Sequence, residues 1–167
     1  LQMTATIRGF EPLYIQRIAQ LTNKSNQFNL TTLRCSEDDI RAMAADADAL
    51  CLCGKLVDKF GDNGIVTVVA GKRQGDLLDL TLWLMSCRVL KRGMEDAMMD
   101  TLMAQAAAAG VKTVVGHYYP TAKNAMVRDF YAQFGFAKTA EDAEGNTEWR
   151  LEVSGYEPKH PHMKIER

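Results

Sequence analysis

An apolar run at residues 77–85 constrains the fold of this chain more than any other feature. It reads Leu-Leu-Asp-Leu-Thr-Leu-Trp-Leu-Met, and only Asp79 and Thr81 interrupt it. Leucines and an aromatic residue in a run this long, bounded by turn residues at 71–75, are typical of a buried strand. We therefore expect residues 77–85 to form the central strand of a sheet.

The rest of the chain alternates between helical and extended patterns around that strand. Helices are expected over 12–25, over 36–45 behind the N-cap Ser36, over 92–109 and over 125–134; strands are expected over 50–60, 65–70, 77–85, 111–118, 137–141 and 147–153. This order fits several α/β and α+β folds, among them one with a mixed, mostly antiparallel sheet flanked by helices. We expect one domain over 1–155, with 1–30 as a helical lead-in and 156–167 as a flexible C-terminal tail.

Composition and charge exclude several classes of function. The chain has 20 basic and 21 acidic residues, so it has no overall positive field to hold nucleic acid. No apolar run is long enough to cross a bilayer, and no secretory leader is visible. The four cysteines form no C-x-x-C pair and have no histidine pair beside them, so we expect no metal site. Reduced thiols fit a cytoplasmic protein.

A motif at residues 124–136 is similar to one in a known family. An asparagine, Asn124, precedes a helical stretch that ends Phe-Tyr-x-x-x-Gly-Phe. This spacing resembles the GCN5-related acetyltransferases (GNAT), which implies the GNAT-like acyl-CoA N-acyltransferase fold. In that family the asparagine and the tyrosine lie near the pantetheine arm and the sulfur of coenzyme A, which implies such roles for Asn124 and Tyr131.

The GNAT diphosphate loop falls on residues 90–95. Backbone N–H groups at a helix N-terminus attract phosphate, and glycine lets the phosphate approach closely. Only the middle glycine, Gly93, is kept, and Glu95 stands where the pattern has its last glycine. Lys91 and Arg92 could offset that carboxylate. The expected cofactor is coenzyme A or the phosphopantetheine of a carrier protein, and the expected binding residues are Met85, Arg88, Lys91, Arg92, Gly93 and Asn124.

Three further segments, residues 17–32, 60–64 and 83–90, look like the C-terminal region of FkbH-like proteins, the IIIC subfamily of HAD-superfamily phosphatases. The resemblance implies an N-terminal HAD-like domain and the loading of a glyceryl group onto an acyl carrier protein. The HAD nucleophile motif Asp-x-Asp-x-Thr does not occur in this chain, and residues 77–81 come nearest to it. We therefore expect the phosphatase chemistry to belong to another part of the protein.

Cys87, His117 and Tyr131 are the candidate catalytic residues. Cys87 follows the central strand, and the neighbouring Arg88 would favour its thiolate, the nucleophile in acyl transfer. A lone cysteine at a strand end also serves as a small apolar residue. His117 could orient or deprotonate Cys87, or could be structural. Tyr131 could protonate a leaving thiolate, or could belong to the core.

Three functions stay open at this point. The first is transfer of a glyceryl-type acyl group to a carrier-protein phosphopantetheine, with Cys87 as a covalent intermediate site. The second is an acetyl-CoA-dependent N-acetyltransferase, and the third is a non-catalytic module that docks the carrier protein or the HAD-like domain. For the first, we expect the pantetheine arm to lie between strands 77–85 and 111–118, where unpaired backbone groups could bind an extended amide chain.

Overall fold

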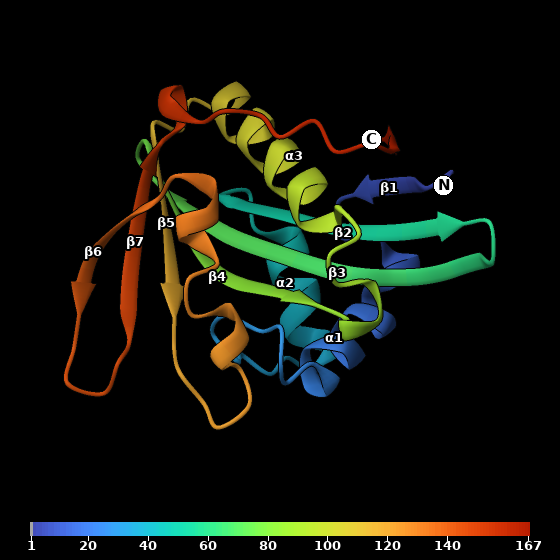
Figure 1. Cartoon of the computed structure of the whole chain (residues 1–167), viewed down its shortest axis with the longest axis horizontal. Helices are drawn as coiled ribbons and strands as arrows, with labels where there is room; N and C mark the ends of the chain where they lie inside the picture. The colour runs from blue at the N-terminus through green and yellow to red at the C-terminus, as the bar shows by residue number, and fades with distance from the viewer. Residues whose placement is uncertain (1) are drawn as a thin grey trace.

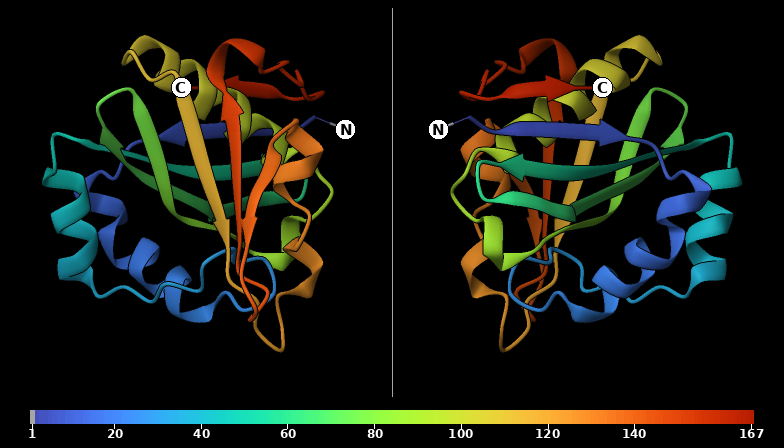
Figure 2. Two further views of the ribbon diagram at one scale, coloured as in Figure 1. Left: turned by 90° about the vertical axis from the view of Figure 1, so that its left-hand side faces the viewer. Right: turned by 90° about the vertical axis from the view of Figure 1, so that its right-hand side faces the viewer.

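A computed structural model describes residues 2–167, which form one eight-stranded sheet with helices on both faces (Figures 1 and 2). The strand order is β6-β7-β5-β4-β3-β2-β1-β8. The strands are β1 (Thr4–Arg8), β2 (Ala49–Asp58), β3 (Gly61–Gln74), β4 (Leu77–Met85), β5 (Thr113–Tyr118), β6 (Ala137–Glu141), β7 (Thr147–Glu152) and β8 (Lys164–Glu166). The α-helices are α1 (Ile15–Lys24), α2 (Glu37–Ala45) and α3 (Met94–Ala108).

The central position of β4 is confirmed. It pairs with β3 in antiparallel fashion along most of its length and with β5 in parallel at its start. The other pairs around it, β2 with β3, β5 with β7 and β6 with β7, are antiparallel. The predicted fold class, a mostly antiparallel mixed sheet flanked by helices, is therefore confirmed.

The sheet separates two apolar cores. One lies under α3 and contains Leu78, Leu80 and Trp83, and the other lies under α1 and α2 and contains Leu82 and Leu84. Side chains along a regular strand alternate between the two faces of the sheet, but β4 does not keep this alternation. Gly71 of β3 pairs with Leu80, whereas the neighbouring Ala70 pairs with Leu82, two residues further along β4. Thr81 is therefore the extra residue of a β-bulge, which bends the strand and increases its twist.

The bulge coincides with the separation of β4 from β5. The last parallel pair is Asp79 with Val115, and beyond it β4 stays on β3 while β5 stays on β7. The two parallel strands therefore part after this pair, at the place where the pantetheine arm is expected. This separation leaves one edge of the C-terminal half of β4 without a partner strand from the main sheet.

Local signals in the sequence explain how α2 and α3 begin. Ser36 accepts a hydrogen bond from the Asp39 N–H at 3.1 Å, and the Asp39 carboxylate accepts one from the Ser36 N–H at 2.8 Å. This capping box satisfies two N–H groups that a helix start leaves free. The helix α3 follows Gly93, whose φ of 93° favours glycine.

Two elements differ from the sequence prediction. Residues 4–8, expected within a helical lead-in, form β1, because pairing with β2 buries Ala5 and Ile7 in the sheet. Residues 125–134, expected as one helix, form two short 3₁₀ turns, Ala125–Val127 and Tyr131–Phe134. Phe130 and Phe134 are buried there, so aromatic packing outweighs the helical preference of this segment.

The C-terminal segment is also placed differently from the expected flexible tail. Its strand β8 pairs with β1 in parallel, beside the start of the chain (Figure 2). The carboxylate of Asp100 in α3 accepts hydrogen bonds from the Tyr156 hydroxyl at 2.5 Å and from the N–H groups of Lys159 and His160 at 2.8 and 2.9 Å. These contacts hold the segment across α3.

A glycine on β5 gives a test of this packing. A Cβ added at Gly116 would lie within 2.7 Å of three ring atoms of Tyr131, whereas one added at Gly155 would meet no atom within 4 Å. We expect Gly116→Ala to lower the free energy of unfolding by about 1–3 kcal/mol, because the buried tyrosine must shift. Gly155→Ala should change it by less than about 0.5 kcal/mol. Urea denaturation of both variants measures the difference, and equal stabilities would contradict the packing.

Candidate active site

A cleft of about 750 Å³ opens at the C-terminal end of β4. One wall comes from α1 and the loop after it, and the other from residues 85–88 at the end of β4. Ser86 starts a 3₁₀ turn there, Cys87–Val89, and its hydroxyl accepts from the Arg88 N–H at 3.4 Å. Leu21, Phe28 and Met85 give the cleft an apolar floor.

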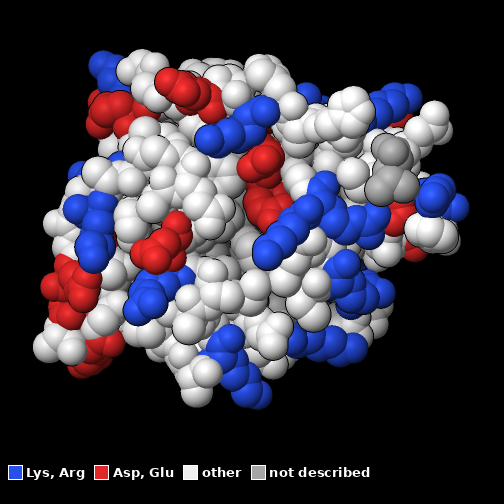
Figure 3. Space-filling view, in the orientation of Figure 1, with Lys and Arg blue, Asp and Glu red and all other residues white. Residues whose placement is uncertain are grey.

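Four cationic side chains line this cleft, and no acidic residue does in the part of the chain described. They are Arg17, Lys24, Arg88 and Lys123. Within residues 2–167, none of the four has a carboxylate partner within 4.0 Å. Figure 3 shows Lys and Arg side chains over α1 and the end of β4, at the lower right, with no acidic side chain between them. Unpaired positive charge in a concave site favours an anionic ligand.

Two of these cations are close enough to repel each other. Burial lowers the pKa of Arg17, and the nearby guanidinium of Arg88 lowers it further. An anion between the two groups would remove that repulsion. A negatively charged ligand would therefore stabilise this pair of cations.

Cys87 is the exposed cysteine of the four and lines the cleft. The other three differ in environment. Burial raises the pKa of Cys35, raises that of Cys51 to about 11 and raises that of Cys53 to about 12. Those thiols stay protonated at neutral pH, and protonated thiols are poor nucleophiles. Cys87 is therefore the thiol best placed to react with a ligand in the cleft.

His117 lies away from the cleft. Its Nε2 is 2.6 Å from Oδ1 of Asp79, near the start of β4. Asp79 and Met85 are six positions apart in β4, which corresponds to roughly 20 Å along a strand. The structure thus does not bring His117 to Cys87, and the hydrogen-bond partner of this histidine is Asp79 instead.

Tyr131 belongs to the core under α3. It is 2% exposed, and its ring packs against those of Trp83, Phe130 and Phe136. Burial raises the pKa of its hydroxyl well above the usual value. An enclosed, weakly acidic phenol is poorly suited to protonate a leaving group in the cleft.

The loop expected to bind a diphosphate is already engaged within the chain. The Lys91 N–H donates to Oε2 of Glu95 at 3.3 Å, and Arg92 forms an ion pair with Asp58. The C-terminal segment covers Gly93, because a Cβ added there would meet Met163 at 3.0 Å and Pro161 at 3.3 Å. Residues 91–93 therefore do not fit the diphosphate of coenzyme A in this conformation.

Asn124 is a buried structural residue. Its Nδ2 donates to the carbonyl oxygens of Asn29 at 2.9 Å and Tyr119 at 3.0 Å. Its Oδ1 accepts from the N–H of Thr121 at 2.8 Å and the hydroxyl of Tyr118 at 3.3 Å. All of its hydrogen-bonding groups are used to join the α1–α2 connection to the end of β5, so a cofactor contact would have to replace one of these bonds.

The structure thus unites Met85, Cys87 and Arg88 of the predicted set, and adds cations that the sequence did not single out. Arg17 and Lys24 lie seven residues apart on α1, which places them on one helix face. Lys123 comes from the loop after β5. The helical spacing could have paired the first two, but no sequence signal links either of them to Lys123 or to the end of β4.

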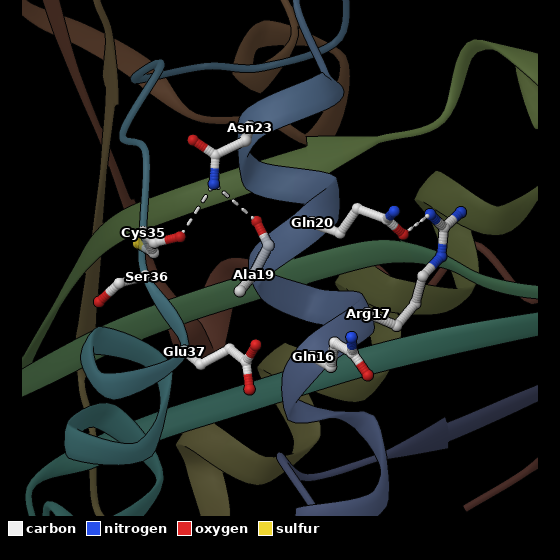
Figure 4. Close-up of a pocket in the computed structure, with 8 residues that line it drawn as sticks. All are labelled: Gln16, Arg17, Ala19, Gln20, Asn23, Cys35, Ser36 and Glu37. Carbon is white, nitrogen blue, oxygen red and sulfur yellow. Dashed lines mark hydrogen bonds between the residues drawn. The ribbon is translucent and has the colours of Figure 1, made fainter.

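A second cleft, of about 490 Å³, lies between α1 and the start of α2 (Figure 4). The Asn23 side chain donates there to the carbonyl oxygens of Ala19 at 2.9 Å and Cys35 at 3.0 Å. Arg17 lines both clefts and donates to Gln20 at 2.9 Å. Asn23 thus fixes the α1–α2 connection, which also forms a wall of the first cleft.

The fold is shared with acetyltransferases of known structure. The ribosomal-protein-S18-alanine N-acetyltransferase of Escherichia coli matches with a TM-score of 0.66 and 14% identity, over 89% of this chain and 94% of that one. A putative GNAT-family acetyltransferase of Desulfovibrio desulfuricans matches with a TM-score of 0.70 and 14% identity, over 89% and 99%. The spermidine N-acetyltransferase of Vibrio cholerae, solved with CoA and spermine, matches with a TM-score of 0.65 and 10% identity, over 90% and 96%.

These likenesses define the class of fold. No family sequence model and no curated protein sequence matches the chain. At such low identities the structural matches establish the fold alone, which is the GNAT acetyltransferase fold. Among residues 2–167, no cluster of three His, Cys, Asp or Glu side chains could hold a metal ion, and no helix is long and apolar enough to cross a membrane.

The cysteine environments predict selective modification. At pH 7.5, iodoacetamide should alkylate Cys87 first, because the thiolates of Cys51 and Cys53 form only as the pH approaches 11 and 12. Peptide mass spectrometry over time measures the order. Alkylation of Cys51 or Cys53 as fast as Cys87 in the folded protein would contradict the assignment.

The buried amide of Asn124 predicts a loss of stability on its removal. We expect Asn124→Ala to lower the free energy of unfolding by about 3 kcal/mol, because it leaves buried hydrogen-bonding groups without partners. Asn63→Ala, which removes one half-buried bond to the Leu56 carbonyl, is the matched control and should cost about 1 kcal/mol. Thermal and urea unfolding measure both, and an unchanged stability for Asn124→Ala would contradict a structural role.

Proposed function

We propose that this chain is an acyltransferase built on the GNAT fold, in which Cys87 accepts the acyl group. The observation that carries the proposal is the position of Cys87, exposed in a cleft lined by four cations and no carboxylate among the described residues. An exposed thiol in such a cleft can reach the carbonyl group of a bound acyl donor, and sulfur nucleophiles form covalent acyl intermediates. The acetyltransferase fold supports the reaction class.

The proposed reaction has two steps, acylation of Cys87 and transfer of the acyl group to a second thiol. The Cys87 thiol loses its proton to solvent, and the thiolate sulfur attacks the carbonyl carbon of the activated acyl donor. The donor's leaving group departs with the electron pair of the broken bond, and a thioester forms on Cys87. A second thiol then loses its proton, attacks that thioester and releases Cys87 as the thiolate.

The acyl group and its acceptor follow from the resemblance to FkbH-like proteins. On that basis the group is of the glyceryl type, the acceptor is the phosphopantetheine thiol of an acyl carrier protein, and a HAD-like domain of the same protein supplies the activated group. The four cations of the cleft support a phosphate-bearing partner, because a phosphodiester is the charged group of a carrier-bound pantetheine.

The second candidate is acetyl transfer from acetyl-CoA to an amine. The fold favours it, since the structural neighbours include N-acetyltransferases and one was solved with CoA. The engaged loop at residues 91–95 weighs against coenzyme A in the position where that loop would hold its diphosphate. Acetyl-CoA is therefore the second donor to test.

An acylation assay tests the assignment of Cys87. Incubation with a glyceryl thioester of N-acetylcysteamine, or with acetyl-CoA, should add one acyl mass to the protein, on the peptide that contains Cys87. Cys87→Ser should reduce this labelling by at least about tenfold, because the serine hydroxyl is not ionised at neutral pH. Cys51→Ser is the matched control and should label like the parent. No adduct from either donor, or full labelling of Cys87→Ser, would overturn the proposal.

A further inference from the structure

The gap between β4 and β5 is closed by a segment of the chain itself. Beyond the bulge, β4 no longer pairs with β5. The Trp83 carbonyl and the Met85 N–H lie on the edge that β5 leaves. The Trp83 carbonyl accepts from the Leu30 N–H, and the Met85 N–H donates to the Phe28 carbonyl, both at 3.0 Å. Asn29 thereby forms an antiparallel bridge with Leu84. Residues 28–30 therefore satisfy the backbone groups that an extended ligand would have used.

The same segment reaches the other side of the gap. The Tyr119 N–H, just after β5, donates to the Leu30 carbonyl at 2.9 Å. The Thr31 hydroxyl donates to the Thr81 carbonyl at the bulge at 2.7 Å. Asn124 adds the hydrogen bond to Asn29 described above. The segment is thus bonded to both strands and does not merely lie over the gap.

Aromatic side chains fill the space on the α3 side of this segment. The ring of Phe130 contacts those of Phe28 and Trp83, with centroids 5.3 and 5.0 Å apart. Phe28, Trp83 and Phe130 are each buried. Opening a passage here would expose these buried aromatic rings to water, which is unfavourable. The expected course of the pantetheine arm between β4 and β5 is therefore blocked in this structure.

We infer that a phosphopantetheine thiol reaches Cys87 from the α1 side, with its phosphate held by Arg17, Lys24, Arg88 and Lys123. This inference rests on the proposed acyl transfer and adds the binding site of the thiol. The apolar floor of the cleft, Leu21, Phe28 and Met85, suits the hydrocarbon part of the arm. Phe28 thus borders both regions, because its backbone closes the gap and the residue also lines the cleft.

The phosphate is the group that this site should discriminate. Charge-assisted hydrogen bonds from Arg and Lys to phosphate are stronger than neutral ones, and Arg17 and Arg88 have no competing carboxylate in the described chain. A pantetheine without its phosphate would keep the apolar contacts but lose these bonds. Coenzyme A and a carrier protein both present the phosphopantetheine unit, so the site chemistry is common to the two sources.

Binding to Cys87→Ser protein tests the site without the chemistry. Isothermal titration should show 4′-phosphopantetheine binding at least about tenfold more tightly than pantetheine. Lys24→Ala with Lys123→Ala should reduce this ratio to about threefold or less. Arg92→Ala, which alters the loop at residues 91–93 but not the cleft, is the matched control and should keep the ratio. Thermal melts confirm that each variant is folded.

The outcomes separate the site from the reaction and the two sources from each other. Equal or undetectable binding of the two compounds, or a ratio that only Arg92→Ala reduces, would overturn the inference. Failure of Cys87 acylation would overturn the proposed reaction and leave this measurement intact. Coenzyme A binding more tightly than 4′-phosphopantetheine would identify free coenzyme A as the source, and weaker binding would identify a carrier protein.

Discussion

The β-bulge at Thr81 shapes both the sheet and the candidate site of this chain. It moves the side chains of β4 from one core to the other, and the pairing with β5 ends at the same place, after Asp79. A sheet that parts in this way must satisfy the exposed backbone of β4 by other means. Here residues 28–30 do so, and they draw the end of α1 toward the end of β4.

The position of the cleft depends on the pairing of residues 28–30 with β4. Because residues 28–30 are bonded to β4, the helix before them stands beside Cys87 and brings Arg17 and Lys24 with it. The buried amide of Asn124 fixes the same segment from the other side. The pairing of residues 28–30 with β4 thus brings the cations of α1 to the end of β4 and supports the hydrogen bond of Asn124 to Asn29.

The residues that resemble a coenzyme A site have become structural in this chain. Glu95 and Asp58 engage the loop from which a diphosphate would be bound, and the C-terminal segment lies over Gly93. Tyr131 is held in the aromatic core. A shared fold can therefore carry different side-chain contacts at these positions, because fold and binding site are separate properties.

The central strand, the capping of α2 and the hairpins could be predicted from the sequence, since each depends on local periodicity and turn residues. The class of fold is implied by the resemblance of residues 124–136 to the GNAT motif. The sequence also marked Cys87 as a candidate through its place after the strand. Long-range packing and pairing make β1 a strand, bury Tyr131 and Asn124, and place His117 beside Asp79. They also bring Lys123 to the cleft. Those outcomes depend on contacts between residues far apart in the chain, and no local pattern encodes such contacts.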